Sequence, residues 1–450
     1  MQKMAEGIAI IPTSPEFIRN RDSHYPFRFD SYFYYLTAFK EPESVLLIIA
    51  GAEPKTVLFC RDKDMEREIW DGFRYGPEAA VVEFGIDEAY SISQLDEIAP
   101  KLIANQGKLF YSLGADPAWD LRVTAWLNQL RSQARTGVSA PDEVVDVRKY
   151  LDEMRLFKSA YEIETMRLSA NIAAAAHQRA MQLTKPGMME YEIEAEFLHT
   201  FYRGGAQAPA YTSIVAGGAN ACTLHYNANN APMRDGDLLL IDAGCELDGY
   251  ASDITRTFPI NGKFSAAQKD LYELVLASQA AAIAQVSPNN HWNAPHEAAL
   301  EVLIRGFIDF GLCKGSAEEV LETGSYRQFY MHRTGHWLGL DVHDAGEYKD
   351  KYGNWRMLEK GMALTVEPGC YVRPADNVPE HFWNIGIRIE DDVVVTENGC
   401  EIITKAAPKT VPEIEALMQD DCARHYRRWR SSRCNTGINL TAKRYRCDYD

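Results

Sequence analysis

The sequence lacks three features that would each indicate a particular class of protein. None of its 450 residues belongs to an uninterrupted run of about 20 apolar residues, so we expect no membrane span. The N-terminus has no basic stretch followed by a long apolar one, so we expect no secretory signal and a cytoplasmic location. Basic residues number 47 against 64 acidic ones. A nucleic-acid-binding face needs clustered Lys and Arg, so nucleic acid is not an expected partner.

The cysteines do not form a recognisable metal or disulfide pattern. Their number is nine, and none is part of a C-x-x-C pair, which removes the usual support for structural zinc. We expect free thiols in a reduced compartment. Three of them lie at 421–450, where residues 422–450 carry eight basic and two acidic side chains. This segment differs from the acidic body, and we expect it to be a non-catalytic tail.

The pattern of apolar residues predicts two domains before this tail. In residues 1–150 we expect strands at 44–50 and 56–60 and helices at 64–73 and 120–131, which is typical of a small α/β domain. Residues 136–146 contain Gly, Ser, Pro and acidic residues and are interpreted as a linker. In residues 151–420 we expect helices at 158–183, 191–203, 266–286 and 294–310. Strands are expected there at 238–243, 254–258, 362–367 and 385–395.

The second domain contains an internal similarity. Residues 233–244 can be aligned with residues 358–369, with the apolar strand positions in register. The alignment places Asp242 over Glu367 and Gly244 over Gly369. We interpret it as a duplication with a site shared between two halves.

Carboxylates at the ends of apolar strands are the strongest chemical signal. Asp242 follows four apolar residues, Asp253 lies just before the next strand, and Glu367 and Glu390 end two later strands. Charged groups are rarely buried unless they are paired or bind metal. Four carboxylates brought together would repel one another, and a pair of divalent metals would remove that conflict.

Three histidines lie close together in the second half of this domain. His332, His336 and His343 fall within twelve residues, and Gly335 and Gly339 argue against a helix there. The helical H-E-x-x-H zinc motif is absent. A lone histidine is more often structural, but this cluster favours a functional role. His225 is a weaker candidate by itself.

These residues stand in motifs that resemble the pita-bread metallopeptidases, and most closely the bacterial Xaa-Pro aminopeptidases. In the second domain the motifs are Leu224-His-Tyr226, Ile241-Asp-Ala-Gly-Cys-Glu246, Asp253-Ile-Thr-Arg-Thr-Phe258, His336-Trp-Leu-Gly-Leu-Asp-Val-His343, Leu364-Thr-Val-Glu-Pro-Gly369 and Gly386-Ile-Arg-Ile-Glu390. In the first domain they are Tyr25-Pro-Phe-Arg28 and Glu41-Pro-Glu43. The resemblance implies an α/β (α+β) protein. A small creatinase-like domain at 1–150 would precede a pita-bread domain at 151–420 with an internal pseudo-twofold repeat.

The same resemblance implies a dinuclear metal site with five ligands. Asp242 and Glu390 would bridge both metals, Asp253 would chelate one, and His336 with Glu367 would hold the other. An oxygen-rich set with one imidazole suits hard cations, and members of this family typically use Mn²⁺. The sequence leaves Co²⁺ and Zn²⁺ open.

The implied reaction is release of the N-terminal residue from peptides with proline in second position. A hydroxide bridging the metals would attack the carbonyl, with Glu367 transferring the proton. His343 and His225 would hydrogen-bond the carbonyl oxygen or the peptide backbone. His332 would shape the proline pocket and help to protonate the leaving nitrogen. Arg388 could hold Glu390 or a substrate group, or act only as a counter-ion.

Other functions remain open at this stage. A prolidase would use the same five ligands on dipeptides, whereas a methionine aminopeptidase would lack the first domain. A non-catalytic binding module would have no need of five mutually repelling ligands. The family also implies a homo-oligomer, a dimer or tetramer, in which Trp70 is a core or interface residue. Arg333 departs from the smaller, uncharged residues of close relatives and could alter the mouth of the pocket.

Overall fold

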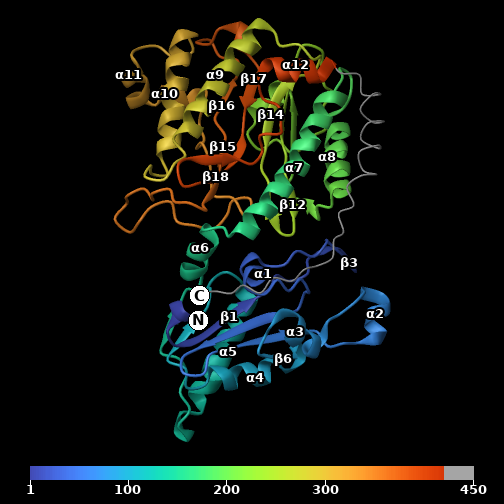
Figure 1. The fold of residues 1–450 in the computed structure, drawn as a ribbon, viewed down its shortest axis with the longest axis vertical. Helices are drawn as coiled ribbons and strands as arrows, with labels where there is room; N and C mark the ends of the chain where they lie inside the picture. Colours follow the sequence, from blue (N-terminus) through green and yellow to red (C-terminus); the bar gives the residue numbers. More distant parts are fainter. Residues whose placement is uncertain (420–450) are drawn as a thin grey trace. The chain divides into compact units, whose positions relative to one another are not determined.

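The computed structural model describes residues 1–419, which fold as two compact units. Unit 1 comprises Met1–Phe157 and the short segment Asp344–Tyr348, and unit 2 comprises Lys158–His343 and the chain from Lys349 onward. Figure 1 shows both units. The tail predicted at 421–450 lies outside the described residues.

Unit 1 is built on a mixed six-stranded sheet with the order β6-β5-β4-β1-β7-β8. Strand β1 pairs antiparallel with β4 and parallel with β7. Its strands are β1 (Gly7–Pro12), β4 (Val45–Ala50), β5 (Lys55–Cys60), β6 (Glu88–Ser91), β7 (Lys108–Phe110) and β8 (Glu143–Val145), and a separate hairpin joins β2 (Ile18–Asn20) to β3 (Ser23–His24). Its helices are α1 (Ser31–Thr37), α2 (Met65–Asp71), α3 (Gly76–Phe84), α4 (Leu95–Ile103), α5 (Pro117–Ser132) and α6 (Arg148–Leu156).

Helices cover both faces of this sheet, which explains why its central strands are apolar throughout. Ile8 and Leu47 face one core, which α4 and α5 complete with Leu95 and Val123. Alternate residues such as Ala9 face a second core, which includes side chains of α1, α3 and α6. Successive side chains of a strand point to opposite faces, so a strand buried on both faces has no polar alternation.

The expected strands and helices of unit 1 are confirmed as β4, β5, α2 and α5, with small shifts in their ends. The expectation of a linker at 136–146 is wrong for three of its residues. Residues Glu143–Val145 form β8, which pairs parallel with β7 at the edge of the sheet. Only three residues pair, and the partner strand lies far back in the sequence, so local composition does not reveal the strand.

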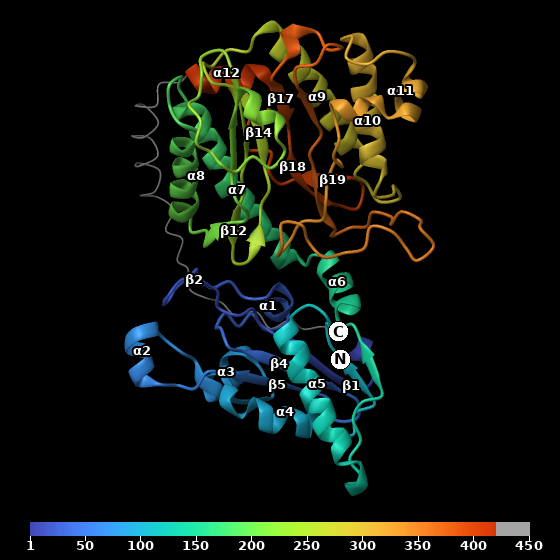
Figure 2. The same ribbon diagram turned by 180° about the vertical axis from the view of Figure 1, so that it is seen from behind.

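Unit 2 surrounds short strands with helices. Its helices are α7 (Ala160–Leu183), α8 (Glu190–Gly204), α9 (Ala266–Ala284), α10 (Ala294–Asp309), α11 (Ala317–Thr323) and α12 (Val411–Gln419). Capping boxes begin α7 at Ser159 and α9 at Ser265, as expected for serine before a helix with Glu or Gln three residues on. Figures 1 and 2 show α7 and α8 on one side of the strands and α9 and α10 on the other.

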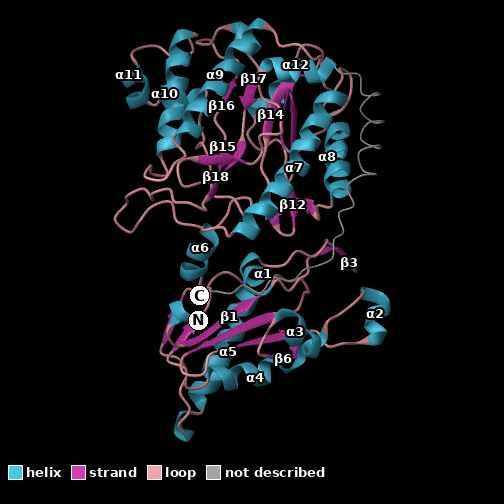
Figure 3. Ribbon diagram, in the orientation of Figure 1, coloured by secondary structure: helices cyan, strands magenta, loops and turns pink. Residues whose placement is uncertain are grey.

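The strands of unit 2 form several small sheets near its centre (Figure 3). They are β9 (Ala208–Pro209), β10 (Ile214–Gly217), β11 (Leu238–Asp242), β12 (Cys245–Leu247), β13 (Tyr250–Ala251), β14 (Thr255–Pro259), β15 (Ala363–Val366), β16 (Gly369–Val372), β17 (Ile385–Arg388), β18 (Asp391–Val395) and β19 (Cys400–Ile402). Strand β11 pairs antiparallel with β14, and β15 pairs antiparallel with β18. Strands β11 and β15 occupy the aligned positions of the sequence repeat, and β12 and β16 follow them in the same order.

The expectation of a single strand at 385–395 is wrong. The chain forms β17 and β18, which belong to different sheets because β17 pairs with β16 and β18 pairs with β15. The break falls at Ile389 and Glu390, where the Glu390 N–H donates to the Thr255 carbonyl oxygen over 3.1 Å. A continuous apolar run cannot show such a change of partner.

Two other expectations concern the described residues as a whole. All six cysteines before residue 420 are free thiols, five of them buried. Within the described part of the chain, no helix combines the length and the apolar character needed to cross a membrane.

Candidate active site

Strand pairing in unit 2 brings the predicted carboxylates to one place. Asp242 ends β11 and lies opposite Thr255, the first residue of β14, so Asp253 is two residues from this pair. Glu367 directly follows β15, and Glu390 stands in the break between β17 and β18. The expected pairing of the strands next to Asp242 and Asp253 is confirmed.

Short distances connect all five predicted ligands. The Asp253 Oδ2 atom lies 3.4 Å from His336 Nε2, which is 3.7 Å from Glu367 Oε1. Potential ligand atoms of Asp253, His336 and Glu390 all lie within 4.8 Å of one another. Asp242 joins the group through Tyr211, whose hydroxyl oxygen lies 2.6 Å from Asp242 Oδ1 and 2.5 Å from Asp253 Oδ1 and can donate its one hydrogen to either.

The pKa values in the cluster are shifted because its carboxylates are buried close to one another. Burial raises the pKa of Glu390 well above its usual value, and the charges of Asp253, Glu367 and Asp242 raise it further. Burial also raises the pKa of Glu367 to about 7. Burial opposes charge on His336, but its hydrogen bond to Asp253 and the charge of Glu367 raise its pKa to about 9. A bound cation would therefore stabilise the ionised form of these buried carboxylates.

The residues present fit a pair of hard divalent cations. They offer eight carboxylate oxygens and one imidazole, and the His336 Nδ1 atom is 2.9 Å from the Trp337 carbonyl oxygen. That bond orients the ring so that Nε2 faces the carboxylates, as the outer partner of a metal-bound histidine does. Among the described residues, the one arginine that pairs with the four carboxylates is Arg388, through Asp242. One guanidinium does not balance four carboxylates, whereas two divalent cations do.

Arg388 acts inside the site as a bridge between side chains. Arg388 is 3% exposed, and its guanidinium donates to Asp242 Oδ2 over 2.7 Å, to Tyr371 Oη over 2.9 Å and to Thr255 Oγ1 over 3.1 Å. The sequence suggested Glu390 or a substrate group as its partner. In the structure its carboxylate partner is Asp242, and a contact with a substrate group stays a prediction.

The other predicted histidines lie around this cluster. His332 Nε2 is 2.8 Å from Tyr371 Oη, and its Nδ1 is 3.9 Å from Glu367 Oε2. The rings of His336 and His343 meet edge to face with centroids 4.3 Å apart. Burial lowers the pKa of His343, and the charges of His336 and His225 lower it further. His225 is exposed on the loop between β10 and β11. The segment that carries the other three histidines is not helical, as expected.

Sequence reasoning missed three residues that organise this site. Tyr211 joins two carboxylates, Tyr371 joins His332 to Arg388, and Thr255 donates its hydroxyl to Glu390 Oε2 over 2.6 Å. Thr255 belongs to the motif at 253–258, so the sequence contains a signal that could have identified it. The two tyrosines have no distinguishing spacing, because only folding brings them to the carboxylates.

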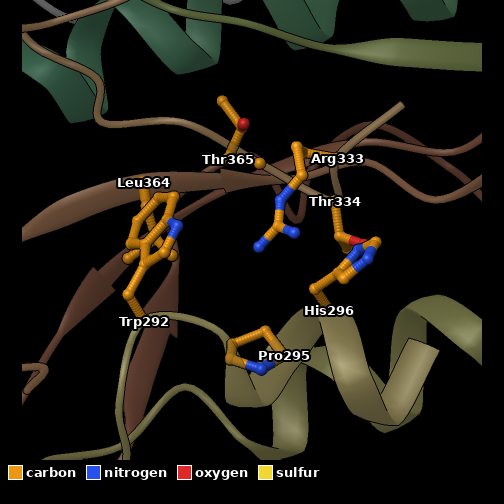
Figure 4. Close-up of a pocket in the computed structure, with 8 residues that line it drawn as sticks. Trp292, Pro295, His296, Arg333, Thr334, Leu364 and Thr365 are labelled. Atoms are coloured by element: carbon orange, nitrogen blue, oxygen red, sulfur yellow. The ribbon is translucent and has the colours of Figure 1, made fainter. Parts of the chain in front are cut away.

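Arg333 lines a small pocket together with residues that include Trp292 and His296 (Figure 4). The pocket has room for about one water, with a volume of ≈ 10 Å³. The guanidinium donates to Asn293 and lies 5.2 Å from the ring centroid of Trp355. Thr334, the next residue, is 2.8 Å from His296 Nδ1 through its hydroxyl, and its carbonyl oxygen accepts the Glu367 N–H.

Fold and site together define a metal-dependent hydrolase of the pita-bread class with an additional α/β domain. Residues 164–397 match the model of metallopeptidase family M24, and residues 1–111 match that of the aminopeptidase P N-terminal domain. The chain belongs to metallopeptidase family M24. The expected fold, a small α/β domain followed by a pita-bread domain, is confirmed.

Relatives with known activity are similar over nearly the whole chain. The Xaa-Pro aminopeptidase of Haemophilus influenzae is 46% identical over 402 residues, which cover 89% of this chain and 90% of that protein. The structure of aminopeptidase PepP from Pseudomonas aeruginosa has a TM-score of 0.90 at 52% identity and covers 92% and 94% of the two chains. Zinc-substituted aminopeptidase P of Escherichia coli in complex with product gives 0.90 at 43% identity, with 93% and 96% covered.

Proposed function

We propose that this chain is a Xaa-Pro aminopeptidase, which releases the N-terminal residue from peptides with proline in second position. The observation that carries the proposal is the convergence of four carboxylates and His336 in a chain of family M24. Similarity to Xaa-Pro aminopeptidases over about nine-tenths of both chains supports the same substrate class. A non-catalytic module would gain nothing from this cluster, since unbalanced buried carboxylates cost stability.

We propose two divalent cations per subunit, with Mn²⁺ as the native metal. Asp242, Asp253, His336, Glu367 and Glu390 would hold them. When bound, such a pair supplies Lewis acidity that generates a nucleophile from water at neutral pH and polarises the scissile carbonyl. Oxygen-rich ligands with one imidazole support Mn²⁺, whereas Co²⁺ and Zn²⁺ would fit the same set.

The chain's own residues would carry the proton transfers. Glu367 would accept the proton of the attacking water, because its carboxylate stands in the ligand cluster beside His336. His332 lies between Glu367 and Tyr371. It would relay the proton that Glu367 takes from the water to the departing proline nitrogen, which has no hydrogen of its own. His343 and His225 hydrogen-bond the substrate carbonyl or backbone. Arg388 keeps Asp242 and Tyr371 in position, and it could also hold a substrate group.

The first test uses the full chain after removal of metal by a chelator. With Mn²⁺ added back, Arg release from Arg-Pro-Pro should return, and cleavage of the dipeptide Ala-Pro should be slower. Cleavage of Ala-Pro alone would assign a prolidase instead. Failure on both substrates, with two metals bound per chain, would overturn the peptidase proposal.

Two further features remain proposals. We propose a homo-oligomer, a dimer or tetramer, because apolar side chains are exposed on unit 1. Peptides with an Xaa-Pro N-terminus are the expected partners, and neither nucleic acid nor membrane is expected.

A further inference from the structure

The loop that carries His225 has little regular structure of its own. It joins β10 to β11, and beyond a short 3₁₀ turn (Gly218–Cys222) it contains the sequence Asn227-Ala-Asn-Asn230. Such a segment has no strong conformational preference and gains none from a helix or sheet ladder. His225 itself is exposed at its tip. Its position must therefore be fixed by contacts from outside the loop.

Glu190 provides four of these contacts, while Arg373 donates to the Cys222 carbonyl oxygen and Asn229 bonds to Val215 and Ser213. It is the first residue of α8, and its side chain is completely buried. Its Oε1 atom accepts the Gly217 N–H over 2.8 Å and the Asn220 side-chain amide over 3.0 Å. Its Oε2 atom accepts the Tyr226 hydroxyl over 2.8 Å and the Ala231 N–H over 2.9 Å. One carboxyl group thus contacts four positions between Gly217 and Ala231.

The chemistry of these four bonds requires a carboxylate. An ionised carboxylate only accepts hydrogen bonds, and each oxygen here receives one backbone N–H and one side-chain donor. No basic side chain of the described residues pairs with Glu190, and its position in the first turn of α8 places the negative charge where the helix dipole favours it. Four donors on a buried carboxylate make a rigid support.

The loop that Glu190 holds also packs against the active site. Ala221 and Cys222 lie in a buried cluster with Tyr371, and Leu224 and Tyr226 pack against that cluster. Tyr371 is the residue that joins His332 to Arg388. A shift of the loop would therefore move His225 relative to the other histidines.

We propose that Glu190 is the positioning residue that holds His225 at the active site through its four hydrogen bonds to the loop. This inference rests on the proposed function, since it assigns His225 a contact with the substrate. Glu190 itself does not touch the substrate. No shorter or uncharged side chain could reach both Gly217 and Ala231 as an acceptor.

The test variant is Glu190→Gln in the full chain, loaded with Mn²⁺. The glutamine side chain has one acceptor oxygen and one NH2 donor. Either the Gly217 N–H or the Ala231 N–H would then face the NH2 group and lose its acceptor, so the loop should become more mobile. We expect kcat for Arg-Pro-Pro to fall about tenfold to hundredfold, as for a displaced catalytic group. The metal content should not change. In the His225→Ala background the same substitution should cause no further loss, because it acts through His225.

Glu162→Gln is the matched control. Glu162 is also a buried glutamate in the first turn of a helix, and it accepts the Ser159 N–H over 2.7 Å and the Tyr250 hydroxyl over 3.0 Å without touching the loop. It should leave kcat unchanged. Tyr226→Phe removes a single bond and provides a milder variant if Glu190→Gln does not fold. We expect a smaller fall in kcat, again absent in the His225→Ala background.

Hydrogen exchange gives a readout that does not depend on activity. The amides of residues 217–231 should exchange faster in Glu190→Gln than in the wild type, and Glu162→Gln should not change them. Unchanged exchange with wild-type kcat would overturn the inference, and so would an equal loss of activity with and without His225. If the wild-type enzyme releases no Arg, the proposed function fails, while the exchange experiment still decides the role of Glu190.

Discussion

At the scale of single residues, the site depends on side chains that hold ligands as much as on the ligands. The Tyr211 hydroxyl lies within hydrogen-bond distance of two carboxylates, Asp242 and Asp253, which share its one hydrogen. Burial and these carboxylates raise the pKa of Tyr211 well above its usual value. The hydroxyl therefore stays a donor across the working pH range, and it fixes the spacing of the two aspartates.

Removing this hydroxyl should weaken the metal site without removing a ligand. We expect Tyr211→Phe to lower Mn²⁺ affinity or activity about tenfold to hundredfold, the usual cost of losing an outer partner of a ligand. Metal titration followed by Arg release from Arg-Pro-Pro measures both. Tyr161→Phe is a suitable control, since Tyr161 bonds to Asp248 on the surface. Unchanged affinity in Tyr211→Phe would show that the aspartates are held by Arg388 and the metals alone.

The candidate ligands could be recognised from sequence because their signal is local. A carboxylate that directly follows an apolar strand is anomalous wherever the strand packs, so Asp242 and Glu367 stand out without a structure. The residues around them give no such signal. Tyr371 and Glu190 are ordinary in sequence and acquire their roles only from neighbours that are distant in the chain.

At the scale of elements, helix α7 carries a buried histidine whose protonation should control stability. His177 is fully buried, and its Nε2 lies 3.0 Å from the Ala243 carbonyl oxygen. Burial lowers its pKa to about 3. Unfolding exposes the ring, which then takes up a proton below its ordinary pKa.

The free energy of unfolding should therefore fall as the pH is lowered from about 6.5 towards 3. One such histidine contributes about 1.4 kcal/mol per pH unit in that window. Urea unfolding at several pH values measures the slope, and His177→Gln should reduce it by this amount relative to the wild type. Equal slopes in the two proteins would mean that His177 is not the group responsible.

The wrong predictions concern strands whose hydrogen-bond partners lie far away in the sequence. Strand β8 forms because it can pair with β7 at the edge of the sheet. The chain breaks between β17 and β18 because β17 pairs with β16 in one sheet and β18 pairs with β15 in another. Long helices such as α7 and α9 were placed well, since their caps and their periodicity are encoded within one segment.

At the scale of the whole molecule, unit 1 exposes an apolar patch that indicates assembly. Its members are Met65, Ile69 and Trp70 of α2 together with Phe73, and Trp70 is 83% exposed. Exposed apolar patches commonly mark interaction surfaces. We expect the protein to be a homo-oligomer through this patch.

Trp70→Glu tests this expectation. The variant should have a lower mass in light scattering than the wild type, because a charge at the centre of a buried interface is costly. Leu121→Glu is the control, since Leu121 is also exposed but lies on α5. A wild-type protein that is monomeric at assay concentrations, or an unchanged mass in Trp70→Glu, would contradict the prediction.

The basic segment at 421–450 should not contribute to catalysis. The candidate site is assembled entirely from residues 211–390, so a chain that ends at residue 420 should retain the kcat/KM of the full chain for Arg-Pro-Pro. The two chains can be compared at equal metal content. A loss of activity on truncation would assign the tail a role that its sequence does not suggest.

The sequence by itself determined the long helices, the internal similarity and the strand-end carboxylates that could be offered to a metal. These follow from composition, periodicity and motifs, which are properties of neighbouring residues. Only the tertiary structure decided that Arg388 bonds to Asp242, that Tyr211 joins two carboxylates and that Glu190 supports the His225 loop. Each of these depends on atoms brought together from distant segments, and packing in a folded core selects such partners by shape and hydrogen bonding rather than by spacing in the chain.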